Sequence, residues 1–294
     1  MLQSLVIPLF DHALIDRRRR RALRRGGPTF LVDAAVAELT ERLAAVRREF
    51  AVAVDFATPT PLLAERLAGS GQTGRVVRLD SLAHPGDGTA SATAVAGLDA
   101  LPLAPASIDL FASAMALHLA HDLPGLLAQA RQALRPDGLL MAVLLAGGTL
   151  TELRLAVAAA EGELRGGASP RVAPFADLRD LGALLQRAGF ALPVADKDDL
   201  VVRYPSALEL IADLRAMGCA NALRDRDRRP LTRAFLARVA AIYAERFSDP
   251  DGKVRATFEL VTLTGWAPHE SQQKPLRPGS AKMTLAAALK SLKI

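Results

Sequence analysis

Two aspartates, Asp55 and Asp80, each close an apolar run that predicts a buried strand. A carboxylate at the end of a strand either caps the following turn or accepts hydrogen bonds from a bound ligand, and both roles stay open here. The turn after Asp55 contains Ala57, Pro59 and Pro61 and no glycine. It is therefore expected to disfavour positive φ and to offer fewer free N–H groups than a glycine-rich, anion-binding turn.

A pair of histidines follows a later predicted strand, residues 107–113. His118 is a candidate general base or substrate contact, because a neutral imidazole titrates near working pH, and packing inside the core is the alternative. His121 lies three residues further on, so both side chains could share one helical turn. A zinc site needs a third ligand, and an iron site for hydroxylation needs two histidines and a carboxylate around an open position. The sequence shows no such triad, so we predict no metal site.

A polar loop braced by prolines follows the last predicted strand and runs from residue 268 to residue 275. Such a loop suits contact with a partner peptide better than formation of a core, although an ordinary exposed loop is the alternative. The candidate partner-binding residues in it are His269, Gln272, Gln273 and Lys274.

Basic residues raise the question of an anionic partner, because the net charge is +6 and the pI is near 10. The arginines at positions 17–21 either dock an acidic partner or pack their aliphatic stems on the flank of the sheet. Arg171 either projects into a cleft, toward a substrate or partner, or forms a salt bridge to a helical lobe. Aromatic residues make up only 4% of the chain, so we do not expect nucleic-acid binding.

The composition favours one large α/β core with a smaller attached lobe, because half of the 294 residues are hydrophobic. The single cysteine, Cys219, cannot form an internal disulfide and indicates a reducing compartment, so we expect a cytoplasmic protein. We find no run of about 18 apolar residues and therefore expect no membrane span.

The order of predicted elements indicates a doubly wound, mostly parallel sheet. Two helices, 11–24 and 31–48, precede strands at 52–55, 75–80, 92–98, 107–113 and 139–146, with helices 62–68 and 122–134 between them. Helices 149–164 and 177–188 lead to a strand ending near 201–204, and helices 207–217 and 232–247 precede a last strand at 254–264. We predict N-terminal helices (1–49), an α/β core (50–204), an inserted helical lobe (205–253), and a closing strand with a basic tail (254–294).

Several motifs along this frame resemble the class I S-adenosylmethionine-dependent methyltransferases. They are the two acid-ending strands, the segments 99–103, 107–110 and 117–118, and the turn and strand at 134–139. The subgroup is the one with the malonyl-carrier-protein methyltransferases. More narrowly, the long motif from Gly265 to Ser280 resembles bacterial relatives of a mitochondrial complex I assembly factor, which is associated with hydroxylation of an arginine.

The resemblance implies a Rossmann-like methyltransferase fold, with S-adenosylmethionine as the cofactor. Asp80 matches the acid that accepts hydrogen bonds from both ribose hydroxyls, whereas Ala57, Pro59 and Pro61 replace the family's glycines. Gly97 stands where the family often has an acid that contacts the adenine, and residues 84–91 stand where the family has a helix. The donor-binding residues that the resemblance implies are Asp55, Ala57, Asp80, Ser81, Leu98, Asp99 and Ser113.

Two functions therefore remain open. The first is an S-adenosylmethionine-dependent methyltransferase, or a related hydroxylase, that acts on a protein or acyl substrate, with a complex I subunit as the protein partner. The second is a degenerate, non-catalytic member of the family that serves as an assembly or scaffolding partner. A closed pocket above Asp55 and Asp80 would favour the second, and an open pocket with aligned N–H groups would favour the first.

Overall fold

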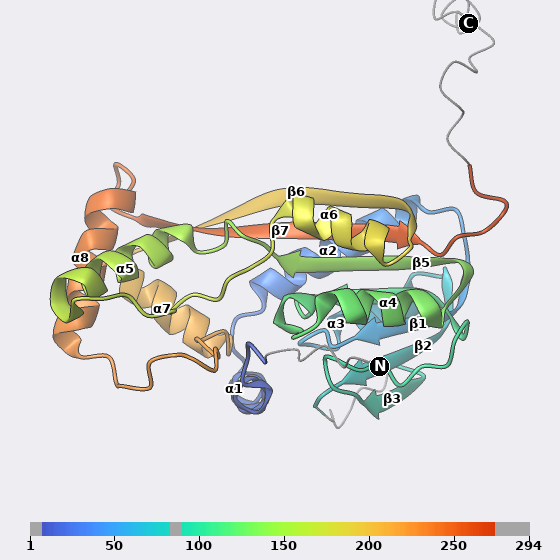
Figure 1. Ribbon diagram of the computed structural model, residues 1–294, viewed down its shortest axis with the longest axis horizontal. Helices are drawn as coiled ribbons and strands as arrows, with labels where there is room; N and C mark the ends of the chain where they lie inside the picture. The colour runs from blue at the N-terminus through green and yellow to red at the C-terminus, as the bar shows by residue number, and fades with distance from the viewer. Residues whose placement is uncertain (1–7, 83–89, 274–294) are drawn as a thin grey trace, which may run out of the picture.

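A seven-stranded sheet forms the centre of the computed structural model, which describes residues 8–82 and 90–273 (Figure 1). The strand order is β3-β2-β1-β4-β5-β7-β6; the first five are parallel, and β7 runs antiparallel to β5 and β6. The strands are β1 (Phe50–Phe56), β2 (Thr73–Asp80), β3 (Ala92–Val95), β4 (Ile108–Ala114), β5 (Leu134–Leu145), β6 (Ala191–Tyr204) and β7 (Val254–Trp266). The predicted Rossmann-like methyltransferase fold is confirmed.

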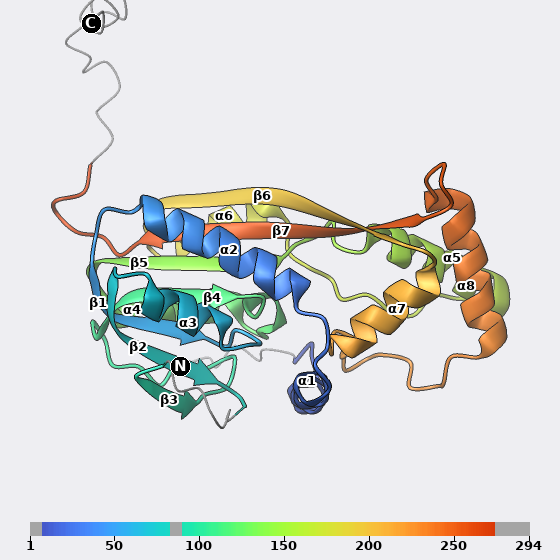
Figure 2. The ribbon, with the colours of Figure 1, turned by 180° about the vertical axis from the view of Figure 1, so that it is seen from behind.

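Helices cover both faces of this sheet. On one face lie α2 (Phe30–Ala45) and α3 (Leu62–Gly69), and on the other lie α4 (Leu123–Ala133) and α6 (Leu178–Arg187) (Figures 1 and 2). Strand β5 is apolar on both sides because both faces are covered. Its alternate side chains enter different clusters: Leu139 and Met141 pack with α2 and α3, whereas Leu140 and Ala142 pack with α4 and α6.

A helical lobe lies at one end of the long β6–β7 pair (Figure 1). It contains α7 (Ala207–Ala216) and α8 (Arg233–Phe247), both inserted between β6 and the last strand as predicted, and α5 (Thr151–Arg165) packs against α8. Buried residues of α8, such as Phe235 and Tyr243, belong to the same hydrophobic cluster as one face of the sheet. The lobe is therefore a continuation of the main core.

Helix α1 (His12–Arg25) begins and ends with clear signals. The side chain of Asp11 accepts a hydrogen bond from the N–H of Leu14 at the start, and Gly26 adopts φ 62° at the end, where a left-handed residue terminates a helix. The helix lies near the carboxyl ends of the parallel strands (Figures 1 and 2). It is the first element of the chain that approaches the candidate site.

One predicted turn differs from the structure. Residues 135–138 were expected to separate a helix from a strand, but β5 already starts at Leu134, which pairs with Ile108. The register then shifts so that Leu110 pairs with Leu139, which places the turn inside the strand as a bulge. Gly138 fits there because an added Cβ would lie 3.0 Å from the carbonyl oxygen of Asp109. Among the described residues, no helix is long and apolar enough to cross a membrane.

Candidate functional site

The two strand-end acids lie beside each other and share one buried cation. Strands β1 and β2 are parallel neighbours, and both Asp55 and Asp80 are fully buried. The guanidinium of Arg78, also fully buried, places Nε 3.6 Å from Oδ2 of Asp55 and Nη2 3.5 Å from Oδ2 of Asp80. It also donates a hydrogen bond of 2.9 Å to the carbonyl oxygen of Thr58. Arg78 thus connects the ends of both strands with the first loop.

A second guanidinium, from α1, also binds Asp80. Arg19 donates from Nη1 to Oδ1 at 2.9 Å and from Nη2 to Oδ2 at 2.8 Å, so both carboxylate oxygens are engaged. This bidentate arrangement is among the strongest side-chain pairings, and the Arg19 side chain is only 11% exposed. Ser81 completes the contact with α1 by donating a 2.7 Å hydrogen bond to Asp16. Helix α1 therefore covers the end of β2.

Contacts with the segment between α7 and α8 hold α1 in this place. Arg18 donates to the carbonyl oxygens of Ala220 and Asn221, at 2.6 and 2.7 Å. Asp11 precedes the helix and accepts a 3.3 Å hydrogen bond from Arg226. Helix α1 therefore contacts the end of β2 through Arg19 and the segment between α7 and α8 through Arg18.

The first loop turns its polar groups toward the sheet. Ala57 has φ 57°, so the expectation that this loop avoids positive φ is wrong at that position. Its N–H donates to the carbonyl oxygen of Leu79 at 2.7 Å. The hydroxyl of Ser113 donates to the carbonyl oxygen of Phe56 at 2.8 Å. The family resemblance implies Ala57 and Ser113 as contacts of S-adenosylmethionine. In this structure both instead form hydrogen bonds that join neighbouring strands.

The segment after β3 divides into a core residue and an accessible one. Leu98, which the family resemblance implies as a contact of S-adenosylmethionine, is buried in the hydrophobic cluster that includes α4. The carboxylate of Asp99 is partly exposed, and its Oδ1 accepts the backbone N–H of His121 at 2.7 Å. Residues 84–91 were expected to replace a helix of the family. Most of them belong to the segment 83–89, which lies outside the described part of the chain.

His118 and His121 have different surroundings. The Nδ1 atom of His118 accepts a long hydrogen bond, 3.5 Å, from the N–H of Leu145, and its ring makes an edge contact with Phe175. Burial lowers the pKa of His118 to about 4. A ring with that pKa is neutral at working pH and a weak base, which favours the packing role over general-base catalysis. His121 lies instead against His12, with ring centroids 3.9 Å apart.

A cavity of about 980 Å³ lies between the strand ends, α1 and the lobe. Its wall reaches the first loop at Pro59 and Thr60, but neither Asp55 nor Asp80 lines it. Much of the lining is aliphatic or aromatic, and among the described lining residues Asp227 is the only acid. Seven arginines line it: Arg18, Arg19, Arg171, Arg215, Arg226, Arg228 and Arg229. The cavity therefore suits an anionic group attached to an apolar one.

Arg171 takes the salt-bridge role that was one of its two alternatives. It donates to Oε1 of Glu161 at 2.8 Å and to Oδ2 of Asp227 at 3.0 Å, although it also lines the cavity. Glu161 is only 1% exposed and accepts two further hydrogen bonds from Ser169. This buried acid therefore fixes the loop that carries Arg171.

The candidate partner loop lies at the opposite end of the strands from Asp55 and Asp80. Because β7 is antiparallel to β5, the residues after Trp266 emerge beside the start of β5, away from the strand ends that carry Asp55. Gln272 donates to Asp137 at 2.9 Å, which fastens the loop to the bulge in β5. His269 and Gln273 are exposed, whereas Lys274 lies outside the described residues. The structure does not bring this loop to the cavity.

Sequence reasoning did not identify Arg19, Arg78 or His12 as residues of this region. Arg78 had a detectable signal, because it lies two residues before Asp80 and therefore on the same face of β2. Arg19 belonged to a basic run for which an acidic partner was considered. In the structure Arg19 pairs with Asp80 of the same chain.

Comparisons with known proteins agree with this fold. A family profile described as a methyltransferase domain matches residues 64–142. A structure of a putative methyltransferase from Bacillus halodurans superposes with a TM-score of 0.54 at 16% identity, over 80% of this chain and 99% of that one. At this identity the likeness concerns the fold alone.

Curated relatives define the family more narrowly. The rat protein named arginine-hydroxylase NDUFAF5, mitochondrial, is 32% identical over 94% of this chain and 82% of its own length. The chain belongs to the NDUFAF5 family of class I methyltransferase-fold proteins. The zebrafish NDUFAF5 is 41% identical over 63% of this chain, and the match spans 58% of that protein. A malonyl-[acyl-carrier protein] O-methyltransferase of Laribacter hongkongensis is 37% identical over 65% of this chain and 61% of its own length.

Membership of this superfamily implies S-adenosylmethionine as the cofactor, and the strand ends allow a test of the fit. In the described arrangement of this NDUFAF5-family chain, both oxygens of Asp80 are bound by Arg19. Arg78 occupies the space between Asp80 and Asp55, and the N–H of Ala57 is bonded within the sheet. In this arrangement these residues do not fit S-adenosylmethionine, so we derive no step of methyl transfer from them.

Proposed function

We propose that this protein serves in the assembly of respiratory complex I as a binding partner of methyltransferase fold, without methyl transfer of its own. The observation that carries the proposal is the bidentate pairing of Arg19 with Asp80, the acid that family resemblance assigns to the donor ribose. The family relation to NDUFAF5 supports the assembly context. A cytoplasmic location is part of the same proposal.

The energetics support the proposal. A hydrogen bond that involves a charged group contributes about 1.5–3 kcal/mol. Two ribose hydroxyls that donate to the Asp80 carboxylate could replace the two hydrogen bonds from Arg19, but not its positive charge. Displacement of Arg19 would leave Asp80 with the more distant guanidinium of Arg78, 3.5 Å away, so part of the charge compensation would be lost. Binding of S-adenosylmethionine would thus carry an electrostatic cost in this arrangement.

A second function is favoured by one specific observation. Arg19 belongs to a helix, and the cavity of about 980 Å³ adjoins the first loop at Pro59 and Thr60. If α1 moves away, a donor-dependent enzyme would have room for a substrate beside the strand ends. The arginines of the cavity wall would favour a substrate with an anionic group, such as an acidic acyl chain, over an arginine side chain.

Isothermal titration with S-adenosylmethionine and its demethylated product tests both functions. The wild type, Arg19→Ala and Asp80→Ala would be compared, with Arg20→Ala as the matched control, because Arg20 is an exposed arginine of the same helix. The proposal expects no binding by any of the four proteins. Binding by the wild type that Asp80→Ala abolishes would overturn it. Binding by Arg19→Ala alone would favour the donor-dependent enzyme with α1 as a removable cover.

Co-purification with subunits of complex I tests the partner role. The wild type would be compared with His269→Ala and Gln273→Ala, two exposed substitutions in the candidate partner loop. We expect the wild type to retain a complex I subunit and both variants to retain less of it. Equal recovery from all three proteins would remove the loop from the proposed interface, and no recovery from the wild type would contradict the partner role.

A further inference from the structure

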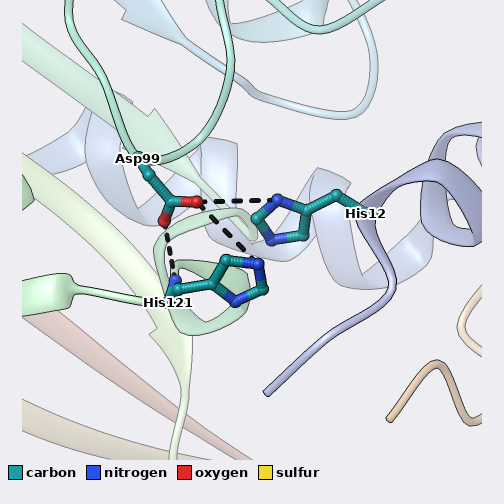
Figure 3. A group of neighbouring side chains, drawn as sticks. All are labelled: His12, Asp99 and His121. Carbon is teal, nitrogen blue, oxygen red and sulfur yellow. Dashed lines mark hydrogen bonds and ion pairs between the residues drawn. The ribbon is translucent and has the colours of Figure 1, made fainter. Parts of the chain in front are cut away.

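Three side chains from distant parts of the chain converge beside the start of α1 (Figure 3). His12 is the first residue of α1, Asp99 lies in the loop after β3, and His121 lies just before α4. Oδ2 of Asp99 is 3.7 Å from Nδ1 of His12 and 3.9 Å from Nε2 of His121. One potential ligand atom from each residue lies within 4.8 Å of those of the other two.

Hydrogen bonds outside the cluster orient its ligand atoms. Nε2 of His12 lies 2.9 Å from the carbonyl oxygen of Leu119, which can only accept, so Nε2 carries the proton and the lone pair of Nδ1 faces Asp99. Oδ1 of Asp99 accepts the N–H of His121, which leaves Oδ2 directed at both rings. Histidine ligands of metals are commonly fixed in this way, by a bond from the other ring nitrogen to a carbonyl or carboxylate.

The charges near the cluster act on an ion in opposite directions. Only a neutral imidazole offers a lone pair to a metal. Burial is the largest influence on the pKa of His121 and lowers it, Asp99 opposes this effect, and Arg224 adds to it. Arg224 also repels a cation, so the carboxylate of Asp99 is the group that supplies compensating charge.

We propose that His12, Asp99 and His121 bind a divalent transition-metal ion. Two imidazoles and one carboxylate are ligands typical of zinc, iron(II), cobalt(II) and nickel(II), rather than of magnesium or calcium, which prefer oxygen. The three side chains are 27%, 36% and 14% exposed, so the remaining positions of the ion face solvent. The site is thus open on one side, like zinc sites with three protein ligands.

Binding of the ion changes the cluster in a defined way. The rings of His12 and His121 are stacked, with an interplanar angle of 4°, whereas an ion must lie in the plane of each ring. Ligand atoms around a tetrahedral ion with bonds of about 2.0–2.1 Å are roughly 3.3 Å apart. The rings therefore splay and approach Asp99 by roughly half an ångström when the ion binds. Side-chain rotation at His12 and His121 is sufficient for this.

The ion would tie α1 to two loops of the core. Because α1 also carries Arg19, a bound ion would add one more link between the start of this helix and the core, beside the contact of His12 with Leu119. This link goes beyond the proposed partner function and does not depend on it. Its test therefore measures metal binding directly.

The experiment uses the full chain without a histidine tag, titrated with zinc by calorimetry and with cobalt(II) by visible absorption. The variants are His12→Gln, His121→Gln and Asp99→Asn, and the last retains an acceptor for the N–H of His121. His269→Gln is the matched control, because it removes an exposed histidine outside the cluster. We expect one ion per wild-type chain, absorption bands of nitrogen-bound cobalt, and affinity lower by about 10- to 100-fold or more in each cluster variant.

Three outcomes would overturn the proposal. They are an absence of zinc and cobalt binding by the wild type, equal affinity in the cluster variants and the wild type, and loss of binding in His269→Gln. The first would leave a hydrogen-bonded His–Asp–His cluster without a metal function. Circular dichroism of each variant shows whether it is folded, and Asp99→Asn keeps the test decisive if a histidine variant is not.

Discussion

Ala57 adopts a backbone conformation that suits glycine better than alanine. At φ 57° its Cβ approaches the neighbouring carbonyl oxygen, which costs about 1–2 kcal/mol for a residue with a side chain. Ala57→Gly relieves this strain, but it also removes a buried methyl group and makes the unfolded chain more flexible, so the free energy of unfolding is expected to change by less than about 1 kcal/mol. Urea unfolding followed by circular dichroism measures the change.

A glycine substitution in the strand before this loop provides the control. Ala51 is exposed in β1 and has no positive φ, so Ala51→Gly is expected to lower the free energy of unfolding by about 0.5–1 kcal/mol. If Ala57→Gly is destabilised more than Ala51→Gly, the strain at Ala57 does not exist in solution.

His118 makes stability depend on pH. Its pKa is about 4 in the folded protein, where burial disfavours the charged ring, and about 6.5 in the unfolded chain. The unfolded state therefore binds more protons between these values, so the contribution of His118 is complete above pH 6.5 and is lost as the pH falls toward 4. We expect a loss of about 2 kcal/mol at pH 4.5, after a discount for partial exposure of the ring.

The variant His118→Asn isolates this contribution, since its amide oxygen can accept the N–H of Leu145. The difference in unfolding free energy between wild type and variant should shrink between pH 7.5 and pH 4.5, as measured by denaturant titration at each pH. A difference that stays constant with pH would show that the ring titrates normally.

Sequence reasoning identified one half of the ion-pair cluster at the strand ends. Asp55 and Asp80 were predicted to close two buried strands, and in the structure these strands are parallel neighbours. The contact between Arg19 and Asp80 could not be predicted, because the two residues are 61 positions apart and no local pattern links them. For the same reason the meeting of His12 with Asp99 was not predicted.

At the scale of elements, the buried Glu161 fastens the loop between α5 and α6. It binds Ser169 and Arg171 and is only 1% exposed. Glu161→Gln removes the charge that Arg171 faces, and we expect it to lower the free energy of unfolding by about 3 kcal/mol. Limited proteolysis should then cut the chain within residues 166–176 faster than in the wild type.

Glu163 provides the control two residues away on α5. It pairs with Arg238, and both side chains are more than 40% exposed, so Glu163→Gln should change stability by less than about 1 kcal/mol. Equal effects of the two substitutions would mean that burial of Glu161 does not strengthen its contacts.

The elements themselves were largely predictable, because helices and buried strands differ in the period of their apolar residues. The inserted helices α7 and α8 and the closing strand β7 were predicted in their observed order. The bulge at residues 135–138 was not, because a Pro-Asp-Gly sequence indicates a turn but does not show that the strand began before it.

At the scale of the whole molecule, the sheet should open from its edges. Strands β4 and β5 lie in the middle and are buried on both faces, whereas the edge strand β3 is short and mostly exposed. We expect amide hydrogens of β4 and β5 to exchange only through global unfolding, and those of β3 through smaller openings. Hydrogen exchange followed by mass spectrometry checks this order, and comparable protection of β3 and β5 would contradict it.

The overall architecture followed from the sequence more readily than the site did. A fold depends on many apolar contacts that share one pattern, so single departures do not change it. The site depends on a few charges from distant segments, where one arginine alters the chemistry. The glycine-poor loop drew attention to this end of the sheet, where the structure places Arg78 between the two acids.

The two arginines at Asp80 differ in how their effects can be undone. Arg19 departs whenever α1 departs, so thermal motion alone can remove it. Arg78 is part of the central sheet and stays between the two acids in every folded conformation that keeps β2 in place. A movement of α1 would therefore uncover Asp80 on one side only, whereas a substitution at position 78 is needed to remove the cation between the two acids. Loss of that buried cation would leave two adjacent carboxylates to repel each other.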